Sequence, residues 1–136
     1  MSEENKAIMR RHNEVINMGN YAVLNELVAH DFVRHDPGGP EVKGLEAYKE
    51  NFRMQRAAFP DLQIIQEDMV AEGDKVVVRY TFTGTHRGEF RGIAPTGRRV
   101  SISGTATVRL AGGKLAESWQ NMDTLGMMQQ LGAKVG

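Results

Sequence analysis

The sequence predicts an α+β fold in which three N-terminal helices pack in the concave face of a strongly curved, mostly antiparallel sheet. Up to Pro60 the apolar residues recur at helical spacing, whereas after Pro60 they alternate with polar residues at every second position. Helices first and strands afterwards are typical of an α+β fold. Because long strands joined by hairpins coil strongly, we expect a cone-shaped barrel whose helices leave an internal pocket.

Three helices are expected in the first part of the chain. The first begins at Ser2, which is followed by two glutamates, and it carries His12 on its apolar face. A short second helix follows the break at Gly19, and residues 32–35 then form a short extended piece. The third helix covers residues 44–59, and it ends there because a proline follows.

Four long strands are expected after the last of these helices, all with alternating apolar and polar positions: residues 62–72, 75–86, 100–110 and 114–123. Gly73 and Gly112 each begin a tight hairpin turn between two of these strands. In the clearest strand Tyr80 and Phe82 share the apolar side, and His86 continues it. A closing helical turn is expected after the last strand.

The composition is that of one soluble globular domain. The 136 residues suffice to bury a core, and no repeat or linker divides residues 1–136. Seventeen basic and seventeen acidic side chains cancel, so we expect neither nucleic acid nor a membrane surface as a partner. The N-terminus lacks the apolar core of a signal peptide, and no run approaches the roughly 18 apolar residues that span a bilayer. A cytoplasmic location is therefore expected.

Residue content argues against metal and covalent mechanisms. There is no cysteine, and the four histidines show neither the HExxH nor the HxH spacing of a metal site. No GxSxG nucleophile motif is present. Residues 92–97 have the glycine spacing of a phosphate-binding loop, but Arg98 and Arg99 replace its Lys-Ser/Thr pair. We expect neither a metal nor a cofactor.

Four segments carry a resemblance that covers nearly the whole chain: HDFVRHDPGGP (30–40), AAFPDLQ (57–63), GTHRGEFRGIAPTGRRV (84–100) and GGKLAESWQNMDTLGMMQQLG (112–132). Together, and in this order, they are similar to the SnoaL-like polyketide cyclase family. This family lies within the cone-shaped α+β barrels of the nuclear transport factor superfamily.

The resemblance implies a cofactor-free intramolecular aldol condensation that closes a ring of an aromatic polyketide. It also implies that Asp123 is the acid/base residue and that His35, in the HDP motif, lies beside the cavity. One departure is that the first helix carries His12 and Asn13 where relatives commonly have an aromatic pair. We therefore expect a pocket more polar than is usual in the family.

Asp123 is the main candidate for acid/base chemistry. A regular strand would place it on the same side as Trp119 and Asn121, and a carboxylate that faces an apolar cavity has a raised pKa suited to proton transfer. The alternative is that Asp123 ends the strand and caps the segment that starts at Thr124. A single bulge in the strand would also reverse the side to which it points.

Each histidine has a functional and a structural interpretation. His35 could donate a proton to a carbonyl oxygen or orient Asp123, or it could bond to the backbone of the turn that follows it. His86 could line the cavity mouth or be exposed at a strand end, and His12 could face the pocket or be a satisfied core histidine. We expect Asp123 and His35 to be catalytic, and the following residues to bind substrate, although core packing is the alternative for the aromatic ones: His12, Phe52, Tyr80, Phe82, His86, Trp119 and Asn121.

The leading functional hypothesis is an aldol-type cyclisation of a small apolar or aromatic carbonyl compound. The acidic C–H of a 1,3-dicarbonyl can be deprotonated without a metal or a Schiff base. Isomerase or dehydratase chemistry in the same pocket is a close variant, and a non-catalytic binding protein is the alternative. The polar Thr/Ser-rich face of the sheet, which includes Thr81, Ser103 and Thr105, predicts a homodimer contact.

Overall fold

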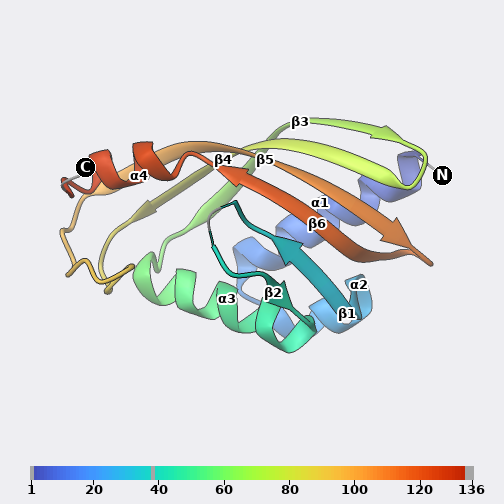
Figure 1. The fold of residues 1–136 in the computed structure, drawn as a ribbon, viewed down its shortest axis with the longest axis horizontal. Helices are drawn as coiled ribbons and strands as arrows, with labels where there is room; N and C mark the ends of the chain where they lie inside the picture. Colours follow the sequence, from blue (N-terminus) through green and yellow to red (C-terminus); the bar gives the residue numbers. More distant parts are fainter. Residues whose placement is uncertain (1, 38, 134–136) are drawn as a thin grey trace.

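A computed structural model of the protein describes residues 2–37 and 39–133, and Figure 1 shows how its elements are arranged. Within these ranges six strands form one curved sheet, in the order β2-β1-β6-β5-β4-β3. In chain order the strands are β1 (Val28–His35), β2 (Val42–Lys43), β3 (Gln63–Glu72), β4 (Lys75–Thr85), β5 (Arg99–Ala111) and β6 (Lys114–Met122).

The two long helices lie together against one face of this sheet (Figure 1). In chain order the helical elements are α1 (Ser2–Met18), the 3-10 turn η1 (Tyr21–Val23), α2 (Leu24–Leu27), α3 (Leu45–Ala58) and α4 (Thr124–Gln130). The predicted α+β class with three N-terminal helices is confirmed, and α4 adds a fourth helix beyond the last strand. None of the described helices is long and apolar enough to cross a membrane.

Strands β1 and β6 form the parallel pair of a sheet whose other neighbouring strands run antiparallel. In this pair Val33 lies opposite Glu117, and His35 lies opposite Trp119. The sequence predicted only a short extended piece at residues 32–35, whereas β1 begins immediately after α2. The strand is longer because β6 offers it a free edge, which the local pattern does not reveal.

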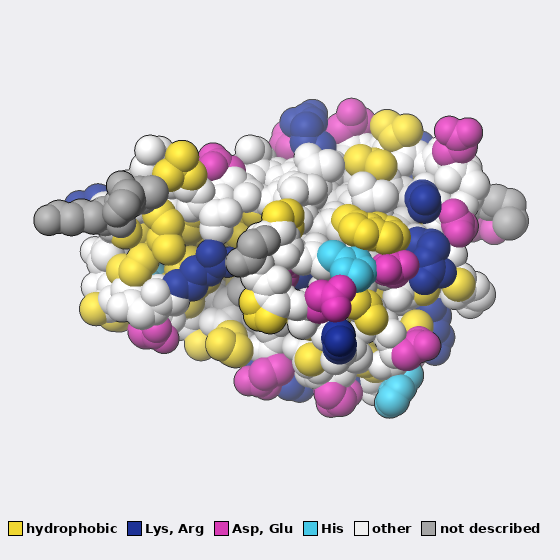
Figure 2. Space-filling model, viewed as in Figure 1, with side chains coloured by type: hydrophobic (Ala, Val, Ile, Leu, Met, Phe, Trp, Pro, Cys, Tyr) yellow, Lys and Arg dark blue, Asp and Glu magenta, His cyan; other side chains and the backbone are white. Residues whose placement is uncertain are grey.

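The core lies between the helices and the concave face of the sheet. Phe32 on β1 and Phe59 after α3 are fully buried in it. Helix α1 is fixed to the sheet by Asn17, whose side-chain amide donates to the carbonyl of Ile64 at 2.9 Å and accepts from its N–H at 2.7 Å. The amide thus pairs with β3 as a neighbouring strand would. Charged side chains of both signs are dispersed over the face shown in Figure 2.

Strand β6 contains a one-residue bulge. Leu110 pairs with Leu115, but the preceding residue of β5, Arg109, pairs with Glu117, so Ala116 has no partner on β5. A bulge reverses the side to which the following residues point. Ser118 is accordingly buried. In a regular strand it would lie on the side opposite the buried Leu115 and would be exposed.

Arg56 on α3 ties three segments together. Its Nη2 donates to the carbonyls of Ile16 and Asn17 in the last turn of α1, at 2.9 and 3.1 Å. Its Nε donates to the Tyr21 hydroxyl at 3.1 Å, and its Nη1 donates to the Pro60 carbonyl at 3.1 Å. A guanidinium at a helix C-terminus satisfies free carbonyls and also opposes the negative end of the helix dipole.

We expect Arg56→Ala to lower the free energy of unfolding by roughly 2–3 kcal/mol, because hydrogen bonds to a charged group are lost and buried carbonyls lose their donor. Urea denaturation monitored by circular dichroism measures this change. The matched control is Arg53→Ala on the same helix, since Arg53 is exposed and, among the described residues, pairs only with Glu50, at 3.3 Å. Equal stability of the two variants would contradict the role of Arg56.

Candidate active site

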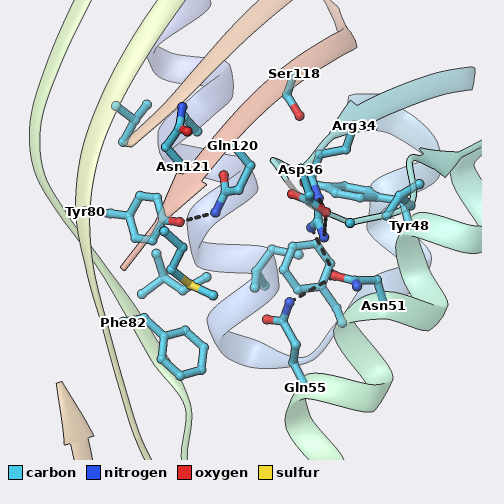
Figure 3. Close-up of a pocket in the computed structure, with 18 of the residues that line it drawn as sticks. Arg34, Asp36, Tyr48, Asn51, Gln55, Tyr80, Phe82, Ser118, Gln120 and Asn121 are labelled. Atoms are coloured by element: carbon cyan, nitrogen blue, oxygen red, sulfur yellow. Dashed lines mark hydrogen bonds and ion pairs between the residues drawn. The ribbon is translucent and has the colours of Figure 1, made fainter. Parts of the chain in front are cut away.

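A pocket of about 930 Å³ lies between α1, α3 and the concave face of the sheet. Its walls come from both helices, from β4, β5 and β6, from residues 36, 37, 39, 40 and 42, and from the loop at residues 89–91. Figure 3 shows polar side chains on both sides of this space, with aromatic rings between them. The volume is in the range of pockets that hold small organic molecules.

One wall carries a buried pair, His12 on α1 and Tyr48 on α3. The Nε2 of His12 and the Tyr48 hydroxyl are 2.8 Å apart, and the two rings stack with their centroids 5.8 Å apart. Burial lowers the pKa of His12 to about 4 and raises the pKa of Tyr48 far above its usual value. At neutral pH the pair is therefore uncharged. Nδ1 of His12 has no hydrogen-bond partner among the described residues, so it is available to a ligand.

The same side of the pocket carries a polar chain that begins in the HDP motif. Nε and Nη2 of Arg34 both donate to Oδ2 of Asp36, at 3.2 and 3.0 Å. Nη1 of Arg34 donates to Oδ1 of Asn51 at 3.0 Å, and that oxygen also accepts from Nε2 of Gln55 at 3.0 Å. All four residues line the pocket (Figure 3). The other oxygen of Asp36, Oδ1, receives no hydrogen bond from the described side chains.

Across the pocket, Tyr80 on β4 pairs with Gln120 on β6 (Figure 3). Nε2 of Gln120 donates to the Tyr80 hydroxyl oxygen, which leaves the hydroxyl hydrogen free for another acceptor. Burial raises the pKa of Tyr80 to about 12. Gly104 lies opposite Tyr80 on β5, where a Cβ atom would come within 2.3 Å of the Tyr80 ring. The phenol therefore occupies its position because this strand residue is a glycine.

Aromatic rings form the other end of the pocket. Phe59 and Phe82 meet edge to face at 5.4 Å, and Phe59 makes a similar contact with Phe90 at 5.3 Å. Phe90 begins a tight turn to Ile93, in which Arg91 has a φ of 50°. This turn holds an aromatic ring at the pocket wall, where it could stack on a flat ligand.

The structure places five of the predicted site residues in the pocket wall: His12, Phe52, Tyr80, Phe82 and Asn121. The other four predicted residues, Asp123, Trp119, His35 and His86, are not among its lining residues.

The orientation expected for Asp123 and Trp119 is wrong. Asp123 is the N-cap of α4, and its carboxylate accepts a hydrogen bond from the N–H of Gly126 at 2.8 Å. The indole of Trp119 lies on the outer face of the sheet and is 36% exposed. The bulge at Ala116 is the physical reason, because it turns the even-numbered residues of β6 inward.

His35 also lies on the outer face, since residues of a strand alternate between its two faces and Arg34 points inward. Its Nε2 is 2.7 Å from Oε2 of Glu117, its Nδ1 pairs with Glu41, and its ring stacks on Trp119. It is therefore not the cavity neighbour that the resemblance implied.

His86 is fully buried beside the pocket rather than in its wall. Its Nδ1 accepts from the backbone N–H of Thr96 at 3.2 Å, and its ring lies 5.5 Å from the ring of Phe59. Its Nε2 has no partner among the described residues. The histidine fixes the loop that carries Phe90, so its contribution to the pocket is indirect.

The sequence reasoning missed the polar residues that line the pocket most closely: Arg34, Asp36, Asn51, Gln55 and Gln120. Asn51 and Gln55 are four positions apart on a predicted helix, a spacing that places them on one face. The sequence therefore showed that Asn51 and Gln55 share one face of the helix. It did not show that this face is turned toward the pocket. Within the described ranges, no three His, Asp or Glu side chains gather as a metal ion would require.

Fold and pocket together define a class of protein, a cone-shaped α+β domain with an internal, partly polar pocket for a small organic molecule. The family model for SnoaL-like polyketide cyclases matches residues 6–131. The chain therefore belongs to the SnoaL-like polyketide cyclase family, as the sequence motifs predicted.

Individual relatives agree with this assignment. Aklanonic acid methyl ester cyclase DauD from Streptomyces sp. (strain C5) is 29% identical over 130 residues, covering 92% of this chain and 80% of that protein. The structure of a candidate SnoaL-like polyketide cyclase from Jannaschia sp. CCS1 has a TM-score of 0.91 at 25% identity, over 99% of this chain and 96% of that one. The structure of IdmH, a candidate polyketide cyclase from Streptomyces antibioticus, has a TM-score of 0.83 at 31% identity, over 95% and 99% of the two chains.

The cap geometry of Asp123 predicts how two substitutions differ. Asp123→Ala should lower the free energy of unfolding by about 1 kcal/mol, because the N–H of Gly126 loses its acceptor. Asp123→Asn should be nearly as stable as the wild type, because asparagine caps helices about as well as aspartate. Thermal denaturation of both variants checks this. Equal stability of the alanine variant and the wild type would contradict the capping role.

Proposed function

We propose that the protein closes a ring in a polyketide-derived carbonyl compound by an intramolecular aldol reaction. The observation that carries this proposal is a carboxylate on one side of the pocket and a phenol on the other (Figure 3). Oδ1 of the carboxylate, Asp36, receives no hydrogen bond from the described side chains, and the phenol, Tyr80, has its hydroxyl hydrogen left to donate. An aldol closure needs one group that accepts a proton from carbon and one that donates a hydrogen bond to oxygen. The cyclase name of the relative DauD supports the same reaction class.

In the first step Oδ1 of Asp36 takes the proton from a carbon that lies between two carbonyl groups. The electron pair of that C–H bond moves into the adjacent carbonyl, and the substrate becomes an enolate. Arg34 holds the carboxylate through two hydrogen bonds to its other oxygen, which leaves Oδ1 as the oxygen that takes the proton.

In the second step the enolate carbon attacks a ketone carbon of the same molecule and forms the new C–C bond. The ketone oxygen becomes an alkoxide and takes the hydroxyl proton of Tyr80. The proton held by Asp36 then returns to the Tyr80 oxygen, which restores both groups. Gln120 supports this exchange because its amide already donates to the Tyr80 oxygen and stabilises the transient phenolate.

His12 and Tyr48 serve as an uncharged hydrogen-bonding wall. Because burial lowers the pKa of His12 to about 4, a proton taken from carbon would create a desolvated charge there. His12 is therefore suited to orient a carbonyl or hydroxyl group of the substrate through Nδ1. Phe59, Phe82 and Phe90 supply the stacking surface for a flat ring system.

The proposal assigns the proton transfer to Asp36 rather than to Asp123, the position that the family resemblance indicated. The carboxylate of Asp123 is occupied by the N-terminus of α4, whereas Asp36 lines the pocket. Both aspartates can be replaced by the isosteric amide, so the two assignments can be compared directly.

With aklanonic acid methyl ester as the test substrate, Asp36→Asn should lower kcat by roughly 10²–10⁴-fold, because the base is lost. Tyr80→Phe should lower kcat by roughly 10²–10³-fold, because the donor to the developing alkoxide is lost. Product formation by liquid chromatography measures both changes, and circular dichroism checks that the variants are folded.

The matched controls are Asp31→Asn, an exposed aspartate on β1, and Asp123→Asn, and both should keep kcat within about twofold of the wild type. Loss of turnover in Asp123→Asn with full activity in Asp36→Asn would overturn the assignment of the base. Recovery of the ester unchanged after incubation with wild-type protein would contradict turnover of this substrate.

We further propose that two copies of the chain associate through the outer face of the sheet. Ile65, Thr81 and Ser103 form a row across β3, β4 and β5, and Ile65 is 49% exposed. The three side chains of this row are uncharged, and the neighbouring carboxylate of Glu67 accepts a hydrogen bond from the Thr81 hydroxyl at 3.3 Å. A two-fold contact centred on the row therefore sets uncharged side chains against each other.

Light scattering should therefore give twice the chain mass of 15.1 kDa for the wild type. Ser103→Arg should give the single-chain mass, because it buries a charge at the centre of the contact. Met18→Arg, which adds the same charge at the end of α1, should leave the dimer intact. A monomeric wild type at high micromolar concentration would contradict this arrangement.

A further inference from the structure

We propose that His35 is a positioning residue, which holds the pocket rim formed by Asp36, Pro37, Gly39, Pro40 and Val42 in place from the outer face of the sheet through a charge-dependent bridge. The bridge consists of His35, Glu41 and Glu117. The inference rests on the proposed function only in so far as the positioned segment includes the base, Asp36.

Each ring nitrogen of His35 faces a different carboxylate. Nε2 lies 2.7 Å from Oε2 of Glu117, and Nδ1 pairs with Oε2 of Glu41. A neutral imidazole has one N–H, whereas an imidazolium has two. Because a carboxylate only accepts hydrogen bonds, both contacts are satisfied together only when the ring is protonated. Figure 2 shows histidine and acidic side chains gathered on this face, over β1 and β6.

The two ends of the bridge differ in how firmly they are held. Glu117 lies on β6, inside the sheet, and its Oε1 accepts from Nε and Nη2 of Arg109 at 3.3 Å each. Glu41 precedes β2, a two-residue edge strand that pairs with β1 at only two positions. His35 therefore ties a weakly paired edge segment to the well-paired centre of the sheet.

The tied segment forms one rim of the pocket. Asp36, Pro37, Gly39, Pro40 and Val42 all line it. Because side chains alternate along β1, a bridge to His35 on the outer face fixes the backbone from which Arg34 and Asp36 point inward. Loss of the bridge should loosen this rim without unfolding the core, which lies on the other side of the strand.

The charges around His35 decide in which pH range the bridge holds. The hydrogen bond to Glu117, and then the charge of Glu41, raise the pKa of His35 above its usual value of about 6.5. Two cations also belong to the cluster, Arg109 beside Glu117 and Lys43 at 3.8 Å from Glu41. A histidine with a raised folded pKa contributes stability that is complete below about pH 6.5 and is lost as the pH rises through the folded pKa.

Trp119 offers a direct optical test, since it is the one tryptophan of the sequence and its ring stacks on His35 at 5.5 Å. A stacked imidazolium quenches indole fluorescence more strongly than a neutral imidazole. Emission should therefore rise with pH, with a midpoint above 6.5 in the wild type. The transition should vanish in His35→Gln and persist in His30→Gln, an exposed histidine on the same strand. A midpoint at or below about 6.5, or a transition unchanged in His35→Gln, would overturn the charged bridge.

Hydrogen exchange tests whether the bridge positions the rim. At pH 6.5, amides of residues 39 and 41–43 should exchange roughly tenfold faster in His35→Gln and in Glu117→Gln than in the wild type, because a charge-assisted contact is lost. His30→Gln should match the wild type, and β5 amides should be unchanged in every variant. The difference between His35→Gln and wild type should disappear at pH values above the fluorescence midpoint.

Equal exchange of the rim in wild type and His35→Gln would refute the positioning role. Neither measurement uses a substrate, so this result would be distinguishable from failure of the proposed aldol reaction.

Discussion

A one-residue bulge in β6 decides which side chains of the last strand reach the pocket. Leu115, before the bulge, packs in the core, and the unpaired Ala116 shifts the alternation by one position. Gln120 therefore points inward and supplies the hydrogen bond to Tyr80, while Trp119 points outward and stacks on His35. In a regular strand the indole would face the pocket, and Tyr80 would lose its amide partner. Both the polar wall and the outer cluster thus depend on the same local irregularity.

Strand β1 connects these two faces through three consecutive residues. Arg34 and Asp36 point into the pocket, and His35 between them points to the outer face. The parallel pairing with β6 makes this arrangement possible, because it sets His35 opposite Trp119 and next to Glu117. A short motif therefore carries an ion pair on the inside and a second one on the outside. The geometry of each depends on the same stretch of backbone.

The fold could be predicted from the sequence because the spacing of apolar residues changes from helical to alternating after Pro60. This change involves many residues, so one residue that departs from the pattern does not alter the prediction. The site could be predicted only in part. Tyr80 and Phe82 lie on a regular strand, so their inward orientation followed from the pattern. The orientation of Asp123 depended on the bulge at Ala116, and alanine carries no signal for a bulge. Asp36 was missed because tertiary packing, which no local pattern reports, brings α3 with Asn51 against Arg34, the partner of Asp36.

The ion pair between Arg34 and Asp36 also limits the substrates that the pocket can process. A carboxylate in an apolar pocket is stabilised by a paired guanidinium, which offsets the desolvation of both charges. The same pairing leaves Oδ1 to accept a proton, because Oδ2 is engaged by two hydrogen bonds from Arg34. A base of this kind removes a proton at a useful rate only from carbon that is unusually acidic. Carbon between two carbonyl groups meets that requirement, since the charge of its enolate spreads over two oxygens. A carboxylate as the base is thus the reason to expect a 1,3-dicarbonyl rather than a simple ketone as substrate.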